Sequence, residues 1–249
     1  ARCQNFKIAP PGGCLIGSRP VDTHFAGLAE LGAEISTDNG YYFVNKKKGI
    51  LSRSRKIVLR EFSVTATENI LIAAALTPGI TKLRIAATEP HVQDLTSFLK
   101  EMGAEIKGSG THELEIRGVR RLRGANHFLI PDPIEAGTFI VAAAATRGKV
   151  LIKNVIADHL DLVLEKMKEI GVNWQLMKNS IKVNPSTRFK AVKIQTLPYP
   201  GIPTDLQAPL AVLCTQAEGQ SLIHDPMYEG RFKYVNELVK MGADANILD

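Results

Sequence analysis

Residues that could carry out chemistry gather in a glycine- and proline-rich segment near the start of the chain. Cys14 follows a Pro-Pro-Gly-Gly run, and Arg19 comes shortly before an amphipathic helix pattern that begins at Val21. A helix N-terminus and a guanidinium both attract anions and favour the thiolate form of a cysteine. Cys14 could therefore act as an acid, a base or a nucleophile beside a bound phosphate. From the spacing alone, a loop cysteine without a chemical task is the alternative.

The elements that must position this segment belong to an internal repeat with a period of about 70 residues. One glycine ends an amphipathic helix pattern in each copy and recurs as Gly32, Gly103, Gly171 and Gly242. A second glycine follows an alanine-rich helix pattern and recurs as Gly79, Gly148 and Gly219. Because two independent patterns share one period, the sequence predicts a repeated supersecondary unit.

Each copy predicts the element order β-α-β-α-β-β. In the first complete copy we expect strands at 56–59, 82–86, 105–107 and 113–116, and helices at 67–76 and 91–102. Later copies predict helices at 134–146, 160–170, 205–217 and 232–241, and strands at 150–154, 173–176, 180–183 and 221–224. The predicted fold class is therefore α/β (α+β), with helices inside and sheets outside. The weakly patterned stretch 117–132 predicts a boundary between domains at 1–130 and 131–249, with a cleft between them.

Composition restricts the classes of protein that fit. With 45% hydrophobic and 22% charged residues, the 249-residue chain is typical of a globular protein rather than a disordered one. A net charge of +6 suits anionic ligands, which include phosphorylated metabolites and nucleic acids. The chain has no apolar run of about 20 residues, so no membrane span is expected. Three cysteines predict a reducing cytoplasm rather than a disulfide framework, and the missing initiator methionine predicts a truncated chain.

Several motifs keep a fixed spacing along the chain. The first is the run Gly12-Gly13-Cys14-x-Ile16-Gly17-x-Arg19-Pro20-Val21-Asp22-x-His24. Others follow at Ser63-Val64-x-Ala66-Thr67, Glu89-Pro90, Pro131-Asp132, Ile134-Glu135-x-Gly137-Thr138-Phe139, Pro203-Thr204-Asp205-x-Gln207-Ala208 and Glu229-x-Arg231-Phe232. Over essentially the whole chain they resemble the UDP-N-acetylglucosamine 1-carboxyvinyltransferases, an enolpyruvyl transferase family. That family builds two inside-out α/β domains from β-α-β-α-β-β units, so the resemblance also accounts for the repeat.

The resemblance implies transfer of the enolpyruvyl group from phosphoenolpyruvate to the 3-hydroxyl of UDP-N-acetylglucosamine, the first committed step of peptidoglycan precursor synthesis. Cys14 would protonate the phosphoenolpyruvate methylene, and Asp205 would take the proton from the sugar hydroxyl. Arg19 would join Cys14 in contacting phosphoenolpyruvate, and Arg231 would order the site. The residues implied for UDP-sugar binding are Arg19, Pro20, Val21, Asp22, Thr23, Ser63, Val64, Asp205 and Met227. The two substrates are the only implied partners, without a cofactor or a metal, in the cytoplasm.

Some positions depart from the family pattern. Glu61 stands where a basic residue is often found beside the nucleotide, and Thr23 stands where leucine is usual. Thr65 replaces a glycine, and His91 replaces an acidic residue. We expect a carboxylate at position 61 to weaken the attraction for a diphosphate, or to pair with Arg60. A lysine-asparagine pair and further arginines of the family are missing from this chain, which predicts an incomplete site.

Two other functions remain open. The chain could be an inactive fragment or relative that only binds nucleotide-sugar. It could also be a nucleic-acid-associated protein, because RNA 3′-phosphate cyclases share the repeat fold and basic residues could bind phosphates. The basic run comprises Lys46, Lys47, Lys48, Arg53, Arg55, Lys56 and Arg60. A solvated hairpin edge is the plainer interpretation of that run. The sister family that acts on shikimate 3-phosphate lacks the cysteine loop, so it is the less favoured interpretation of this sequence.

Three further residue types receive structural rather than chemical interpretations. Cys214 lies in an apolar helix pattern and is expected in the core. His24 is expected to form hydrogen bonds where the loop enters its helix, and Trp174 to pack beneath a hairpin. The remaining histidines have no zinc-ligand spacing.

Overall fold

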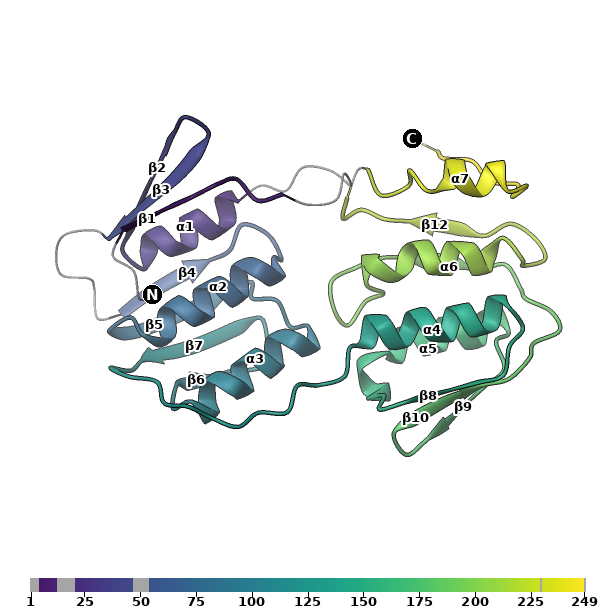
Figure 1. Ribbon diagram of the computed structural model, residues 1–249, viewed down its shortest axis with the longest axis horizontal. Coiled ribbons are helices and arrows are strands. Elements are labelled where there is room, and N and C mark those ends of the chain that lie inside the picture. Colours follow the sequence, from purple (N-terminus) through teal and green to yellow (C-terminus); the bar gives the residue numbers. More distant parts are fainter. Residues whose placement is uncertain (1–4, 13–20, 47–53, 229, 249) are drawn as a thin grey trace. The chain divides into compact units, whose positions relative to one another are not determined.

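The computed structural model describes residues 5–12, 21–46, 54–228 and 230–248, which fall into two compact units (Figure 1). Unit 1 comprises the described residues up to Ile130, and unit 2 comprises those from Pro131 onward. The core of unit 1 surrounds Ile70, and the core of unit 2 surrounds Ile140. Neither core of described residues draws on both units, so each unit buries its apolar side chains separately.

Unit 1 contains one complete copy of the predicted repeat. Its elements are β4 (Ser54–Val58), α2 (Val64–Ala75), β5 (Gly79–Arg84), α3 (Pro90–Glu101), β6 (Glu105–Lys107) and β7 (Glu113–Gly118). The sheet order is β4-β5-β7-β6. β4 and β5 are parallel because α2 carries the chain back between them, whereas β7 is antiparallel to both β5 and β6. The predicted β-α-β-α-β-β order is confirmed for this copy.

A partial copy precedes it in unit 1. It consists of β1 (Asn5–Ile8), α1 (Asp22–Glu30), β2 (Ala33–Asp38) and β3 (Tyr41–Lys46). Its sheet order is β1-β3-β2, and both pairings are antiparallel. This arrangement repeats β5-β7-β6 of the complete copy. The strand β1 was not predicted, although its sequence Asn5-Phe6-Lys7-Ile8 alternates polar with apolar residues.

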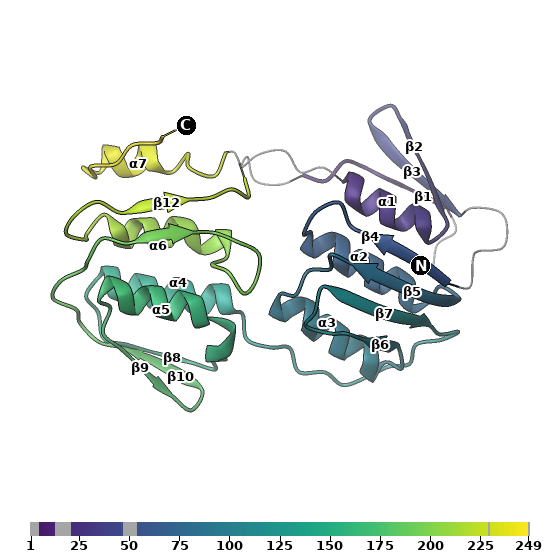
Figure 2. The same cartoon turned by 180° about the vertical axis from the view of Figure 1, so that it is seen from behind.

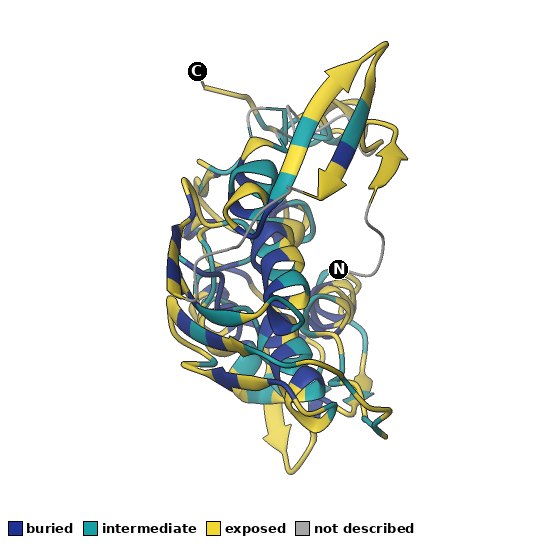
Figure 3. Ribbon diagram, turned by 90° about the vertical axis from the view of Figure 1, so that its left-hand side faces the viewer, coloured by how far each residue is buried: buried dark blue, intermediate teal, exposed yellow. Residues whose placement is uncertain are grey.

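The helices of unit 1 lie on one face of the β4-β5-β7-β6 sheet, as opposite views show (Figures 1 and 2). α2 is apolar on most of its faces because it packs against α1, α3 and β7. The strands of the sheet alternate buried with exposed residues, so their outer face meets solvent (Figure 3). Within unit 1 the helices are therefore inside and the sheet outside, as predicted.

Unit 2 repeats the same arrangement. Its elements are α4 (Pro133–Ala145), β8 (Val150–Lys153), α5 (Asp161–Ile170), β9 (Trp174–Met177), β10 (Ser180–Val183), β11 (Lys193–Gln195), α6 (Gln207–Cys214), β12 (Leu222–His224) and α7 (Val235–Lys240). Two 3-10 turns cover Ala157–His159 and Thr204–Leu206. The antiparallel sheet has the order β8-β10-β9, and β11 pairs in parallel with β12. α4 packs against α6, β8, β10 and the turn Thr204–Leu206.

Two helices of unit 2 are shorter than predicted. The helix expected at 205–217 begins at Gln207, after the turn Thr204–Leu206, and the helix expected at 232–241 begins only at Val235. At the turn Thr204–Leu206 tertiary hydrogen bonds occupy a side-chain group and a backbone group of Thr204. Arg231, for example, bonds to the carbonyl of Thr204. Such contacts compete with regular helical hydrogen bonds, and periodicity in the sequence does not reveal them.

The repeated glycines have a conformational cause. A positive φ, which favours glycine, occurs at Gly32, Gly103, Gly171, Gly242, Gly79 and Gly219. In the middle copy of the second pattern the residue with positive φ is Arg147 (φ 53°), immediately before Gly148. The position of the left-handed residue therefore shifts by one in that copy.

Candidate functional site

Three of the predicted site residues, Cys14, Arg19 and Pro20, lie outside the described part of the chain. The others fall at two places. In unit 1 they occupy the N-termini of α1 and α2, and in unit 2 they occupy the turn Thr204–Leu206 and the segment after β12. Each place is described by itself.

In unit 1 the structure brings two candidate segments together through the packing of their helices. Val21 precedes α1, which begins at Asp22, and Ser63 precedes α2, which begins at Val64. α1 and α2 pack side by side (Figure 1). Gly27 permits this approach, because a Cβ there would lie 2.2 Å from Cδ1 of Ile70. The segments predicted to receive the UDP-sugar therefore begin two adjacent helices.

Side-chain hydrogen bonds join these two helix starts. Thr23 Oγ1 donates to Glu61 Oε1 at 3.1 Å. His24 Nε2 lies 3.3 Å from Thr65 Oγ1, and His24 Nδ1 lies 2.9 Å from Asn69 Nδ2. Since an amide nitrogen only donates, Nδ1 accepts and Nε2 carries the proton in the neutral ring. The predicted hydrogen-bonding role of His24 is confirmed, and its partners lie on α2.

The electrostatics of His24 agree with that tautomer. Burial lowers the pKa of His24, and the nearby Glu61 carboxylate opposes this effect only in part. A histidine with a lowered pKa is neutral at pH 7. The network between α1 and α2 therefore holds one carboxylate and a neutral imidazole.

The N-terminus of α2 has the chemistry of an anion site. Ser63 Oγ accepts from the backbone N–H of Ala66 at 3.3 Å, and the carbonyl of Ser63 accepts from the N–H of Thr67 at 3.0 Å. The N–H groups of Val64 and Thr65 have no intrahelical acceptor in an α-helix, because they belong to its first turn. Together with the helix dipole, such groups can bind phosphate oxygens.

A cavity of about 450 Å³ lies beside this helix start. Its lining includes Val58 and Arg84, the last residues of β4 and β5, together with Phe62, Ile85 and His112. The Phe62 and His112 rings are in contact, with centroids 4.9 Å apart and planes tilted by 59°. The carboxyl ends of parallel strands are the usual ligand-binding edge of an α/β sheet.

In unit 2 the predicted carboxylate is held by the predicted arginine. Arg231 Nη2 donates to Asp205 Oδ1, and Arg231 Nε donates to the carbonyl of Thr204 at 3.3 Å. The Asp205 side chain is 63% exposed, whereas that of Arg231 is only 15% exposed. The guanidinium is thus fixed by its surroundings while the carboxylate faces solvent, where it can meet a ligand.

Asp225 supports this arrangement and was missed by the sequence reasoning. It is buried, and it accepts from Thr204 Oγ1 at 2.5 Å and from the backbone N–H of Met227 at 2.8 Å. Asp225 thereby joins the turn that carries Asp205 to the predicted UDP-sugar residue Met227. The available signal was an aspartate two residues before Met227, which is the spacing of an Asx-turn.

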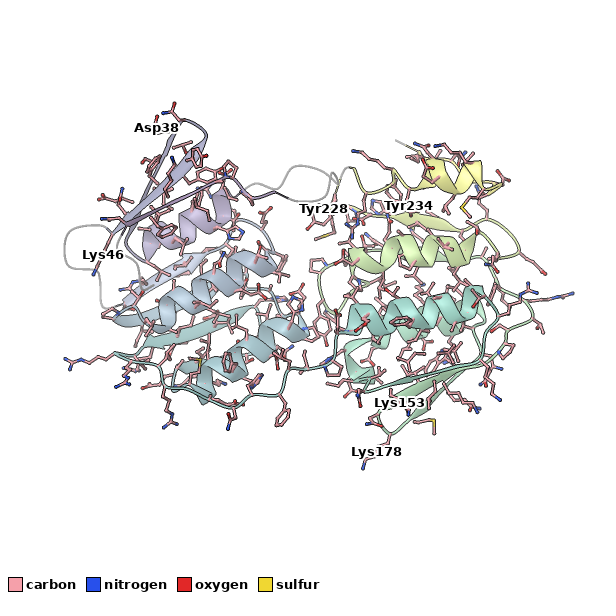
Figure 4. The ribbon with its side chains drawn as sticks, viewed as in Figure 1. Asp38, Lys46, Lys153, Lys178, Tyr228 and Tyr234 are labelled. Carbon is pink, nitrogen blue, oxygen red and sulfur yellow. The ribbon has the colours of Figure 1, made fainter. Side chains whose placement is uncertain are left out.

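Two tyrosines, Tyr228 and Tyr234, interact with Arg231, and Figure 4 labels both tyrosines. The guanidinium carbon of Arg231 lies 5.7 Å from the centre of the Tyr228 ring, within the range of a cation–π contact. Burial raises the pKa of Tyr234, and the Asp225 carboxylate adds to this effect. Tyr234 is therefore protonated at neutral pH and serves as a hydroxyl, not as a base.

In the basic run Lys46, Lys56 and Arg60 are exposed, as predicted for a solvated edge, and Arg55 is not. Lys47, Lys48 and Arg53 lie outside the described residues. Arg55 is buried, and its Nη2 donates to the carbonyl of Pro78 at 2.9 Å. The interpretation as a solvated basic edge is therefore wrong for Arg55, which joins β4 to the end of α2.

The remaining structural interpretations are tested in unit 2. Cys214 is half-buried against the core, and this burial raises the pKa of its thiol. Trp174 packs against the same core from β9, as predicted for a residue beneath a hairpin. Among residues 5–12, 21–46, 54–228 and 230–248, no cluster of three or more acidic, histidine or cysteine side chains could hold a metal ion. In the same ranges, no helix has the length and apolar character needed to cross a membrane.

Comparison with solved structures supports the fold. The enolpyruvyl transferase NikO from Streptomyces tendae matches 100% of this chain with a TM-score of 0.86 and 22% sequence identity, and the match covers 59% of the NikO chain. An EPSP synthase from Acinetobacter baumannii matches 88% of this chain with a TM-score of 0.62 and 22% identity, over 51% of its own chain. At this level of identity the similarity establishes the fold alone, and it confirms the predicted enolpyruvyl transferase fold.

Comparison with sequences is more specific. Curated proteins named UDP-N-acetylglucosamine 1-carboxyvinyltransferase are 48% identical in Caldanaerobacter subterraneus subsp. tengcongensis, 48% in Halothermothrix orenii and 46% in Granulibacter bethesdensis. These matches cover 97–99% of this chain, and the chain spans 57–59% of the length of these relatives. The family model described as EPSP synthase (3-phosphoshikimate 1-carboxyvinyltransferase) matches residues 1–249. The chain therefore belongs to the EPSP synthase (3-phosphoshikimate 1-carboxyvinyltransferase) family.

Proposed function

We propose that this chain forms part of a transferase that moves the enolpyruvyl group from phosphoenolpyruvate to the 3-hydroxyl of UDP-N-acetylglucosamine. The observation that carries the proposal is the solvent-facing carboxylate of Asp205, held by the largely buried Arg231. It occurs in a chain that is 48% identical to relatives named for this reaction. The product would enter peptidoglycan synthesis, and hence cell-wall growth and cell division, in the cytoplasm.

The proposed chemistry is an addition followed by an elimination. The oxygen of the sugar 3-hydroxyl attacks the enol carbon of phosphoenolpyruvate while Asp205 accepts the hydroxyl proton. Cys14 protonates the methylene carbon. The Cys14 thiolate then takes a proton back from the resulting methyl group, the bond between carbon and the phosphate oxygen breaks, phosphate leaves, and the carbon–carbon double bond is restored. Arg19 holds the phosphate, and Arg231 keeps the Asp205 carboxylate in place.

The nucleotide-sugar would bind at the two adjacent helix starts of unit 1. The first-turn N–H groups of α2 suit a diphosphate, because they are free of intrahelical acceptors. The segment from Val21 to Thr23 lies beside them through the hydrogen bonds of Thr23 and His24. Met227 would contribute an apolar contact to the nucleotide-sugar.

We further propose that residues 1–130 and 131–249 are parts of the two domains of the whole enzyme. Phosphoenolpyruvate and UDP-N-acetylglucosamine are the partners of that enzyme, and its chemistry requires no cofactor. Since the curated relatives are longer than this chain, turnover is best measured in a protein extended to their length.

Titration calorimetry tests the binding part of this proposal. We expect the chain to bind UDP-N-acetylglucosamine, and to bind it better than a short RNA of equal charge at both low and high salt. Stronger binding of the RNA, with a steep loss at high salt, would favour the nucleic-acid alternative instead.

A second measurement tests the chemistry. In the extended protein, Cys14→Ala should slow phosphate release from phosphoenolpyruvate by about 100-fold or more, because the acid is lost. Cys214→Ala is the matched control, because that thiol packs against the core of unit 2. Unchanged release in the Cys14 variant would contradict the mechanism.

A further inference from the structure

Two residues that depart from the family pattern form a hydrogen bond with each other. Thr23, in the first turn of α1, is 4% exposed, and its hydroxyl donates to Glu61 Oε1 at 3.1 Å. Glu61 precedes the N-cap residue Ser63 by two positions and is exposed. The buried hydroxyl thus fixes an exposed carboxylate beside the N-terminus of α2.

Little in the described surroundings offsets the charge of this carboxylate. The ion pairs of the described residues do not include the predicted pair between Arg60 and Glu61. His24 faces Glu61, but burial lowers its pKa and keeps the ring neutral at pH 7. The start of α2 therefore combines two features with opposite effects on an anion. The helix N–H groups attract it, and the carboxylate repels it.

We propose that Glu61, positioned by Thr23, is a specificity-determining residue that selects nucleotide diphosphate diesters over nucleoside diphosphates with a free terminal phosphate. This inference rests on the proposed function, because it places the diphosphate at the start of α2. A diester such as UDP-N-acetylglucosamine lacks the titratable terminal phosphate of UDP, which carries roughly one additional negative charge near pH 7. The carboxylate disfavours that additional charge more than it disfavours the diester.

The size of the effect follows from Coulomb's law. Two unit charges about 4 Å apart in water repel by an amount that corresponds to roughly fivefold in an equilibrium constant. The repulsion is screened by salt, with a Debye length of about 10 Å at 0.1 M. Selection against the terminal phosphate should therefore be strong at low salt and weak at high salt.

Titration calorimetry of the chain with UDP-N-acetylglucosamine and with UDP tests the proposal. Near pH 7.5 and at low salt, Glu61→Gln should tighten UDP binding about fivefold more than it tightens UDP-N-acetylglucosamine binding, because only UDP carries the additional charge. At high salt the ratio of the variant's affinity to that of the original chain should approach one for both ligands. Glu34→Gln, which removes an exposed carboxylate from β2, is the control and should change neither affinity.

The role of Thr23 requires a double-mutant cycle. Thr23→Val keeps the shape of the side chain and removes the hydroxyl, so the Glu61 carboxylate is no longer held beside the start of α2. We expect Thr23→Val to tighten UDP binding relative to UDP-N-acetylglucosamine binding when Glu61 is present, and to lose this selective effect when combined with Glu61→Gln. Equal changes in both backgrounds would show that Thr23 acts through packing or through its own ligand contact, and would overturn its positioning role.

The outcomes separate this inference from the proposed function. If UDP-N-acetylglucosamine binds but Glu61→Gln changes both affinities by the same factor, the specificity role is wrong and the proposed function stands. If no variant binds UDP-N-acetylglucosamine, the nucleotide-sugar site itself is wrong, and the specificity role falls with it. A selective increase in UDP affinity that disappears at high salt supports both the specificity role of Glu61 and the proposed nucleotide-sugar site.

Discussion

The helices α4 and α6 occupy equivalent places in successive copies of the repeat, yet they begin in different ways. Asp132 caps α4, where its Oδ1 accepts from the N–H groups of Ile134 at 2.7 Å and Glu135 at 3.3 Å. α6 has no side-chain cap and follows a 3-10 turn, in which Asp205 pairs with Arg231. A carboxylate oxygen that caps a helix accepts hydrogen bonds from the backbone of that helix. The Asp205 carboxylate does not cap α6, so it can take part in a reaction, and the start of α6 lacks the stabilisation that a cap would give.

The largest effect that tests this comparison is on activity. In a protein extended to the length of its relatives, Asp205→Asn should slow phosphate release by about 100-fold or more, because an amide cannot accept the proton. The free energy of unfolding should hardly change, because the side chain is 63% exposed. Asp244→Asn, at an exposed position of the same unit, is the control. Full activity in the Asp205 variant would show that Asp205 takes no part in the reaction, and the proposed chemical difference from Asp132 would be wrong.

The next effect concerns the contact between α4 and the turn before α6. A Cβ on Gly137 would lie 2.6 Å from Cδ1 of Leu206, which is fully buried in the turn that carries Asp205. Gly137→Val should therefore lower the free energy of unfolding by about 2 kcal/mol through overpacking. Urea denaturation of the chain measures this change.

Two related variants sharpen the same test. Gly137→Ala should cost less than the valine variant, because alanine recovers about 1 kcal/mol of helix propensity. Gly124→Val is the control, since a Cβ at Gly124 meets nothing within 4 Å. Equal stability of the valine variants at positions 124 and 137 would show that α4 and the turn can separate without cost.

A smaller effect separates the two aspartates by stability. Asp132→Ala removes the cap of α4 and should cost about 1 kcal/mol in the free energy of unfolding. Asp205→Ala removes only an exposed partner of Arg231 and should cost less. Thermal or urea unfolding of the two variants under identical conditions measures the difference. A larger loss in the Asp205 variant would reverse the comparison.

The smallest effect is expected for the ion pair itself. Arg231→Gln should change the free energy of unfolding by no more than about 1 kcal/mol, because the partner carboxylate is largely exposed. The change should decrease as salt is added, since screening weakens exposed pairs. Urea unfolding at low and high salt measures both quantities. If the free energy of unfolding fell by several kcal/mol at every salt concentration, the hydrogen bond from Arg231 to the Thr204 carbonyl would be the contact that stabilises the turn.

Much of the fold could be predicted from the sequence because its signals are local. Glycines that require positive φ recur with the repeat, and Gly103 and Gly171 mark the helix ends that the structure contains. The strands 105–107 and 180–183 have the predicted bounds. The strand β1 was overlooked, although Asn5-Phe6-Lys7-Ile8 alternates polar with apolar residues. Its pairing with β3 depends on residues far along the chain.

The candidate site was predictable only in part. Asp205 and Arg231 were found through their motifs. The contact between them could not be predicted, because it depends on the path of the chain after β12. Asp225 was missed since a buried carboxylate in a turn looks like any loop aspartate until its partners are known. Arg55 was misread for the same reason. A charged residue in a basic run looks solvated unless the carbonyl of Pro78 is known to face it.

The recurring three-stranded sheets have a consequence for how the chain folds. The sheets β1-β3-β2 and β8-β10-β9, and the strands β5-β7-β6 of the four-stranded sheet, each come from one contiguous stretch of chain, namely 5–46, 150–183 and 79–118. Within them the hairpins β2–β3, β6–β7 and β9–β10 close short loops, so they incur a small entropic cost and can form early. The pairings β1–β3, β5–β7 and β8–β10, like the parallel pairs β4–β5 and β11–β12, join strands that are separated in sequence by a helix. Folding should therefore begin at these hairpins, and the pairings that span a helix should complete last.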